Sequence, residues 1–243
     1  MKKILYIGCC LLLVSWQSQA QQAPAQHKRI NVAVLIYPGV ELMDFAGATD
    51  VFIKAGSLTK DSYHIYTIAL EANAIQTEKG MIRLQPDYNS HTDYPKPDLF
   101  VIPGAAMETI AALKDSTDLL TFIRDMSARA GTTMSICTGA YLLGHAGLLK
   151  GRNATTHWFV ADNFQETFPS LHLQKDVRFV EDGNIITASG ITSGIDAAIY
   201  VVGKFNGPQL ATIVSKAMQY VPHKEESWPK PVAGIKYVPG KNK

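Results

Sequence analysis

The sequence has 243 residues, which is long enough for one large domain, and 47% of them are hydrophobic, an ordinary fraction for a globular protein. Its 23 Lys and Arg nearly balance 21 Asp and Glu, giving a formal net charge of +2. A nearly neutral chain with no basic cluster lacks the electrostatic footprint of nucleic-acid-binding proteins, so we expect no nucleic-acid partner.

The first 20 residues have the pattern of a secretory signal peptide. Two lysines precede an apolar run over residues 4–16, and Ser-Gln-Ala at 18–20 fits the small-x-small cleavage rule. The run is short for a membrane span, so we expect no membrane attachment after cleavage. A lipoprotein is the minor alternative, because Cys9 and Cys10 lie in this segment. The sequence predicts cleavage after Ala20 and a periplasmic or secreted protein.

Cleavage would leave Cys137 as the single cysteine, since the other two of the three lie in the leader. It would also remove two lysines and leave a formally neutral mature chain. A lone cysteine in an oxidising compartment has no internal disulfide partner and is a candidate reactive thiol. The alternative is an inert core cysteine, because free cysteines are often buried.

After a polar leader at 21–29, strand and helix patterns alternate along a domain at 30–221, and a proline-rich tail follows at 222–243. The expected strands lie at 30–37, 63–70, 98–102 and 132–136, the helices at 41–56, 115–129, 192–205 and 208–220, the hairpins at 74–84 and 177–188, and a connecting strand or loop at 151–158. The strands are apolar on both faces, which suits a buried parallel sheet. The sequence therefore predicts an α/β fold, a doubly wound sandwich with a mostly parallel central sheet.

Cys137 lies where the strand at 132–136 turns sharply into a helix beginning near Ala140. A nucleophile placed at such a turn, with small neighbours such as Gly139, is called a nucleophile elbow. The helix N-terminus directs N–H groups at the sulfur, so we expect a lowered thiol pKa and a reactive thiolate.

Two other stretches end at the same edge of the predicted sheet. Asp44 follows the first strand, and Gly104 follows the strand at 98–102. Because parallel strands present their carboxyl ends at one edge, these residues and Cys137 should line one crevice. For Asp44 the alternative is an N-terminal helix cap.

Five stretches carry a more specific pattern. They are residues 37–47, the Ile-Pro-Gly turn at 102–104, Ser-Ile-Cys-Thr-Gly-Ala at 135–140, Ala-Thr-Thr-His-Trp at 154–158 and Ala-Ser-Gly-Ile-Thr-Ser-Gly-Ile-Asp at 188–196. Together they resemble the DJ-1/PfpI superfamily over nearly all of 30–221. Within it, the sequence is most similar to isonitrile hydratases and to the ligand domain of AraC-type regulators, whose DNA-binding helices have no counterpart here.

The resemblance implies a flavodoxin-like fold, a homodimer, and Cys137 as a nucleophile that shares a proton with the neighbouring Asp44. It also places His157 near the cysteine, where the ring could orient or deprotonate the sulfur. The alternative for His157 is a packed ring that braces a loop.

The resemblance further implies an oxyanion site beside Gly104, formed by the backbone N–H groups of Thr138 and Ala105. Ala105 departs from the family, which commonly has a second glycine at this position. The remaining histidines show no paired ligand spacing, so we expect no metal, and nothing in the sequence calls for a cofactor.

The function expected from this resemblance is addition of water to a small electrophilic carbon substrate, as in isonitrile hydratases, with Cys137 as nucleophile and Asp44 as acid and base. Glyoxalase-type chemistry on 2-oxoaldehydes is one alternative. A non-catalytic ligand-binding or thiol redox-sensor domain is another, because fold alone does not decide function.

We predict that the protein is exported and that its signal peptide is cleaved. Expressed in a bacterial host, the protein should be recovered with Gln21 as its N-terminus, because the apolar run and residues 18–20 present a cleavage site. Intact-mass analysis of the recovered protein measures this. A full-length cytoplasmic species, or a lipid on Cys9 or Cys10, would contradict it.

Overall fold

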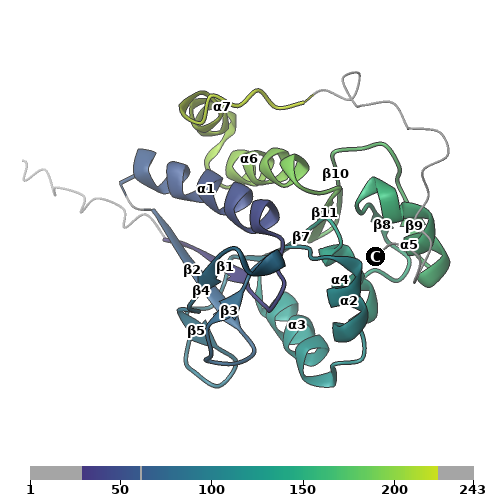
Figure 1. Ribbon diagram of the computed structural model, residues 1–243. Helices are drawn as coiled ribbons and strands as arrows, with labels where there is room; N and C mark the ends of the chain where they lie inside the picture. Colours follow the sequence, from purple (N-terminus) through teal and green to yellow (C-terminus); the bar gives the residue numbers. More distant parts are fainter. Residues whose placement is uncertain (1–28, 61, 224–243) are drawn as a thin grey trace, which may run out of the picture.

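The computed structural model describes residues 29–60 and 62–223 (Figure 1). The predicted signal peptide, most of the polar leader and the tail beyond His223 lie outside the described residues, so those predictions stay predictions.

Strands and helices alternate along the described chain. The strands are β1 (Ile30–Leu35), β2 (Tyr63–Ala69), β3 (Ile75–Gln76), β4 (Arg83–Leu84), β5 (Tyr88–Asn89), β6 (Leu99–Ile102), β7 (Thr132–Ile136), β8 (Asn153–Ala154), β9 (His172–Leu173), β10 (Phe179–Asp182) and β11 (Ile185–Ala188). The helices are α1 (Leu42–Leu58), α2 (Met107–Leu113), α3 (Thr117–Arg129), α4 (Gly139–His145), α5 (Ala161–Thr167), α6 (Thr192–Asn206) and α7 (Pro208–Ala217), with single 3-10 turns at η1 (Glu78–Gly80) and η2 (Trp158–Val160).

The central sheet has seven strands in the order β10-β11-β7-β6-β1-β2-β5. Every neighbouring pair is parallel except β10 and β11, which form an antiparallel hairpin at one edge. This arrangement confirms the predicted α/β fold with a mostly parallel central sheet. It also places the carboxyl ends of β1, β6, β7 and β11 side by side at one edge.

Both faces of the sheet are covered, as the continuous apolar strands require. In β1, Val32 and Val34 point into one core, whereas Ala33 and Leu35 point into the other. Helices α1, α6 and α7 pack over the first core, and α2, α3, α4 and α5 contribute to the second, so the sheet is the middle layer of a sandwich (Figure 1).

The elements that the sequence did not predict are short. The expected strand at 132–136 is β7, and both expected hairpins form, as β3–β4 and β10–β11. Helices α2 and α5 and strands β5 and β9 were not expected. Each helix has only 7 residues, too few for a clear 3.6-residue periodicity, and the two strands have 2 residues each.

Gly139 lets helix α4 begin directly against the end of β6. A Cβ atom at this position would lie 2.3 Å from the carbonyl oxygen of Ile102 and 2.8 Å from that of Pro103. Both are backbone atoms, so neither can rotate away. Helix α4, and with it the turn that carries Cys137, therefore depends on a residue without a side chain.

We predict that Gly139→Ala destabilises the fold by about 1–3 kcal/mol or more, because the new methyl group forces the β6 and β7 ends apart. Thermal or urea unfolding measures this. Gly203→Ala in α6 is the matched control. Its Cβ would meet only the Ala211 methyl at 3.5 Å, so better helix propensity should leave stability equal or higher by up to about 1 kcal/mol. Equal stability of Gly139→Ala and the unaltered protein would contradict this view of the turn.

Candidate active site

Cys137 and Thr138 connect β7 to α4, and Cys137 has a φ of +57°. Its N–H donates to the carbonyl oxygen of Ala188 at 2.9 Å, so the turn begins where the β7–β11 ladder ends. A non-glycine residue at positive φ is strained, and surrounding contacts must hold it there. The side chain is 7% exposed. Cys137 therefore lies in a strand-to-helix turn, and its role as a nucleophile stays a prediction.

Two glycines let neighbouring loops close around the sulfur. A Cβ at Gly190 would lie 2.9 Å from Cys137 Sγ, and one at Gly104 would lie 2.9 Å from Cys137 Cβ and 2.7 Å from Asp44 Oδ2. Contacts this short would displace the nucleophile candidate or its partner. The loops after β6 and β11 therefore reach Cys137 only because glycine occupies both positions.

Asp44 lies in the first turn of α1 and is fully buried. Its Oδ2 accepts the N–H of Gly104 at 3.0 Å, and its Oδ1 accepts the N–H of Ile191 at 2.7 Å. The side chain of Glu41, rather than that of Asp44, caps α1, because Glu41 Oε2 accepts the N–H of Asp44 at 2.6 Å. The alternative role of Asp44 as a helix cap is therefore wrong.

Asp44 and Cys137 interact electrostatically, and each changes the titration of the other. Burial, with the nearby Glu41 charge second, raises the pKa of Asp44 to about 7, and the N–H groups of Ile191 and Gly104 act in the opposite direction. Burial also raises the pKa of Cys137 well above its ordinary value, followed by the Asp44 charge, and the N–H of Thr138 opposes this. The expectation of a lowered thiol pKa is therefore wrong for the ligand-free protein. Removing the sulfur from water outweighs the field at the start of the seven-residue α4.

The hydrogen bonds indicate which atom holds the proton. Both carboxylate oxygens of Asp44 accept backbone N–H groups, which favours the charged carboxylate and leaves the proton on Cys137. Since the two groups are coupled, the pair retains one proton over a wide pH range. Asp44 can thus accept the thiol proton as a substrate is attacked and return it later.

The expected oxyanion donors are engaged within the protein. Thr138 Oγ1 accepts the N–H of Ala105 at 2.9 Å and donates to the Ala105 carbonyl at 2.6 Å, while the N–H of Gly104 donates to Asp44. The N–H of Thr138 acts to lower the pKa of the Cys137 thiol. A direct oxyanion role for Ala105 or Gly104 therefore requires these bonds to open, and that role stays a prediction.

His157 lies on a loop that is tied to the nucleophile candidate through its neighbour. Thr156 Oγ1 donates to the Cys137 carbonyl at 3.0 Å. The His157 ring is half-buried, burial lowers its pKa, and its centroid lies 5.9 Å from that of Trp158. Within residues 29–60 and 62–223, no ring nitrogen of His157 makes a hydrogen bond. A direct role for His157 on the sulfur stays a prediction, and Thr156 makes the contact that sequence reasoning had left out.

Two further residues of the site were missed at the sequence level. Ile191, at φ +51°, aims its N–H at Asp44, and Glu41 sits three residues before Asp44. The Glu-x-x-Asp spacing at a helix start was the available signal for Glu41. No local pattern marks a strained isoleucine, because the strain arises from contacts made far along the chain.

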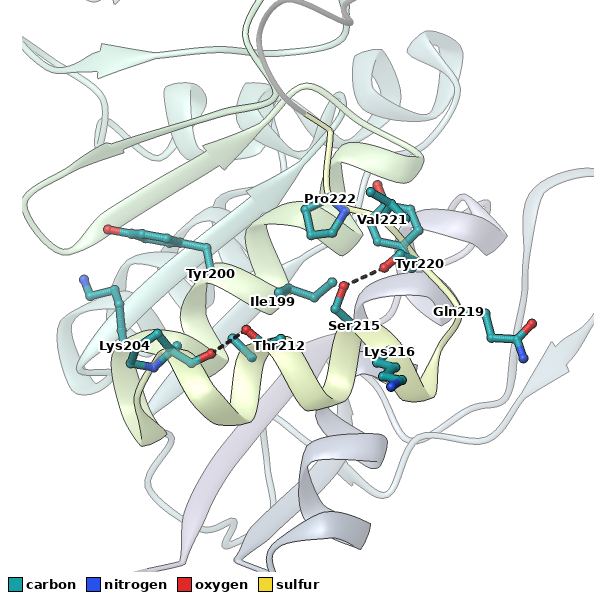
Figure 2. Close-up of a pocket in the computed structure, with 13 residues that line it drawn as sticks. Ile199, Tyr200, Lys204, Thr212, Ser215, Lys216, Gln219, Tyr220, Val221 and Pro222 are labelled. Atoms are coloured by element: carbon teal, nitrogen blue, oxygen red, sulfur yellow. Dashed lines mark hydrogen bonds between the residues drawn. The ribbon is translucent and has the colours of Figure 1, made fainter.

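A groove on the described structure lies elsewhere. It has a volume of about 1000 Å³ and runs along α6, α7 and the segment that follows, with Tyr200, Lys204, Thr212 and Tyr220 among its lining residues (Figure 2). None of its lining residues is Cys137, Asp44 or His157. The chemistry of the buried pair is therefore separate from this groove.

Within the described residues, no cluster of three or more metal-ligating side chains is found, and no helix is long and apolar enough to cross a membrane.

Comparison with known proteins gives the family. The model of the DJ-1/PfpI family matches residues 30–203, which is most of the chain. The chain belongs to the DJ-1/PfpI family. It is 33% identical over 195 residues to an isonitrile hydratase from Pseudomonas putida, covering 79% of each chain.

Regulators are also similar. The chain is 32% identical over 183 residues to the HTH-type transcriptional regulator CdhR of Pseudomonas aeruginosa, matching 75% of this chain and spanning about half, 52%, of the regulator. Among solved structures, a THiJ/PfpI family protein from Pseudomonas syringae superimposes with a TM-score of 0.70 at 27% identity, covering 86% of this chain and 85% of the other. These relatives confirm the flavodoxin-like DJ-1/PfpI fold, and they include both an enzyme and a transcriptional regulator.

The raised pKa of Asp44 predicts a pH-dependent stability. The folded protein binds a proton up to about pH 7, whereas an ordinary aspartate releases it near 3.8. In this window the folded state binds more protons, so the contribution of Asp44 to the free energy of unfolding falls as pH rises, by about 1.4 kcal/mol per pH unit at most.

Urea unfolding of the unaltered protein and Asp44→Asn at several pH values between 4 and 7 measures this difference. The unaltered protein should lose stability relative to Asp44→Asn as pH rises. Asp118→Asn, in the exposed first turn of α3, is the matched control and should follow the unaltered protein. Parallel curves for Asp44→Asn and the unaltered protein would show that Asp44 is an ordinary carboxylate.

Proposed function

We propose that the protein is an exported enzyme of the DJ-1/PfpI family that adds water to a small isonitrile. The carrying observation is the buried pair of Asp44 and Cys137, in which two backbone N–H groups hold the carboxylate and both residues lie against Gly104. The 33% identity to an isonitrile hydratase supports this substrate class.

The reaction needs one nucleophile and one group that moves protons. Cys137 Sγ forms a bond to the isocyano carbon, and Asp44 takes the thiol proton and delivers it to that carbon, giving a thioimidate. Water then adds to the thioimidate carbon, with its proton passing to the nitrogen. Breaking the carbon–sulfur bond releases the N-substituted formamide, and the sulfur recovers its proton through Asp44. The overall change is addition of one water, with no oxidation or reduction.

The raised pKa of Asp44 suits this role. A group that must accept and return a proton in one cycle works best when its pKa is near the working pH. Asp44, at about 7, meets that condition, whereas an exposed aspartate would remain ionised throughout. A buried thiol that loses its proton only to a bound neighbour is also protected from unproductive oxidation.

We further propose that the protein acts as a homodimer in the periplasm or outside the cell. The family resemblance supports dimerisation, and the predicted signal peptide supports export.

A thiol-based sensor or ligand-binding domain is the second candidate. The similarity to a transcriptional regulator favours it. The raised pKa of Cys137 lowers the reactivity of the thiol, which favours ligand binding over redox sensing. A sensor binds its ligand without turnover, so one assay separates the two functions.

We predict that the purified protein converts at least one member of a panel of alkyl and aryl isonitriles, 2-oxoaldehydes and amides, and that isonitriles react best. Cys137→Ser should abolish turnover because the nucleophile is lost. Asp44→Asn should reduce kcat by roughly 10²-fold or more while the protein stays folded, because proton transfer is lost. Product formation followed by mass spectrometry measures both.

Asp118→Asn serves again as control and should retain full activity, since it removes one carboxylate from an exposed helix start. Wild-type turnover in Asp44→Asn would remove the catalytic assignment. Absence of turnover across the panel, together with thermal stabilisation by a panel member, would instead establish the binding role.

A further inference from the structure

A second carboxylate lies against the proton-sharing pair and has no part in the mechanism described above. Glu41, half-buried at the N-terminus of α1, accepts the N–H of Asp44 through Oε2 at 2.6 Å. Its charge acts on both members of the pair, since it raises the pKa of Asp44 and also that of Cys137. Three acidic groups therefore share one small, largely buried space.

Glu41 is also built into the backbone of the site. Its own N–H donates to the Gly104 carbonyl at 2.8 Å, and the N–H of Gly104 donates to Asp44 Oδ2 at 3.0 Å. With the bond from the Asp44 N–H to Glu41, three residues close a ring of hydrogen bonds that joins the start of α1 to the turn after β6. Displacing Glu41 would loosen the turn that binds the carboxylate of Asp44.

The other ionisable groups that face the pair do not carry a comparable free charge. Tyr37, at the end of β1, is buried, and burial raises its pKa well above the ordinary value, while its hydroxyl donates to the Pro103 carbonyl at 2.7 Å. On α6, Asp196 is ion-paired with Arg178, and both side chains are largely buried. Among the described residues, no cation forms a salt bridge with Glu41. Its charge therefore acts on the pair without a counter-ion.

We propose that Glu41 is a positioning residue that fixes Asp44 against the Gly104 turn and whose negative charge opposes loss of the last proton from the Asp44–Cys137 pair. It touches neither the sulfur nor, in the proposed reaction, the substrate. It acts through Asp44, by geometry and by charge, and the two contributions can be separated by substitution.

The role follows from what the pair must do. Once both groups have lost their protons, the site holds a thiolate beside a carboxylate and has no proton to give to a substrate carbon. A nearby negative charge opposes that second loss. The contribution of Glu41 to catalysis rests on the proposed function. Its effect on the titration of the pair does not, so an experiment can disprove either one without the other.

The test follows the rate of Cys137 alkylation by iodoacetamide against pH, with the modified peptide identified by mass spectrometry so that Cys9 and Cys10 do not interfere. Glu41→Gln keeps an oxygen that can accept the Asp44 N–H but removes the charge. Its alkylation midpoint should move to lower pH by about one unit, because the thiolate is no longer opposed by that charge. Glu108→Gln, an exposed change in the first turn of α2, is the matched control and should leave the midpoint in place.

Two more variants separate charge from geometry. Glu41→Asp retains the charge, so its midpoint should stay with that of the unaltered protein, whatever its stability. Glu41→Ala removes both contributions, so it should show the same downward movement as Glu41→Gln together with a melting temperature several degrees lower, from loss of the cap.

The proposal is overturned by an unmoved midpoint in Glu41→Gln, by an equal movement in Glu108→Gln, or by a movement in Glu41→Asp as large as that in Glu41→Gln. None of these readouts requires turnover. An inactive protein that still shows the expected titration would disprove the proposed reaction and keep the role of Glu41.

Discussion

The site depends on one carboxylate that binds two distant backbone N–H groups. Asp44 reaches Gly104 with one oxygen and Ile191 with the other, so a single side chain joins the segments that follow β1, β6 and β11. Cys137, after β7, lies where these segments meet. Because the strands are parallel neighbours in the sheet, their carboxyl ends already lie close together. The carboxylate needs only short hydrogen bonds to bind the loops to one another.

This arrangement accounts for features that would otherwise be unfavourable. Cys137 and Ile191 both have positive φ values, and a β-branched residue is especially strained there. Burying a carboxylate is unfavourable as well, and the raised pKa of Asp44 expresses that penalty. The backbone strain and the buried carboxylate occur at the same place, where packing of the surrounding core keeps these residues in position. Such concentration is typical of functional sites.

The sequence predicted the parts of this site that local patterns specify. Apolar strands followed by glycine-rich turns identified the sheet, and the order of strands placed Asp44, Gly104 and Cys137 at one edge. The titration of Cys137 was predicted with the wrong sign, because a helix N-terminus is visible in the sequence and burial is not. For the same reason the sequence did not predict the hydrogen bond from the Ala105 N–H to Thr138 Oγ1, because this bond forms only where two loops meet in space.

The electrostatics of the pair decide how the thiol can be used. A thiol with a lowered pKa is reactive at all times, and in an oxidising compartment it would be exposed to oxidants continuously. In the proposed reaction the proton stays with the pair until a bound molecule accepts it, so reactivity depends on occupancy of the site. That dependence serves an enzyme, by limiting side reactions, and it would equally serve a sensor that reports a ligand. The relatives include an isonitrile hydratase and a transcriptional regulator, and for this protein the fate of the bound carbon atom distinguishes turnover from binding.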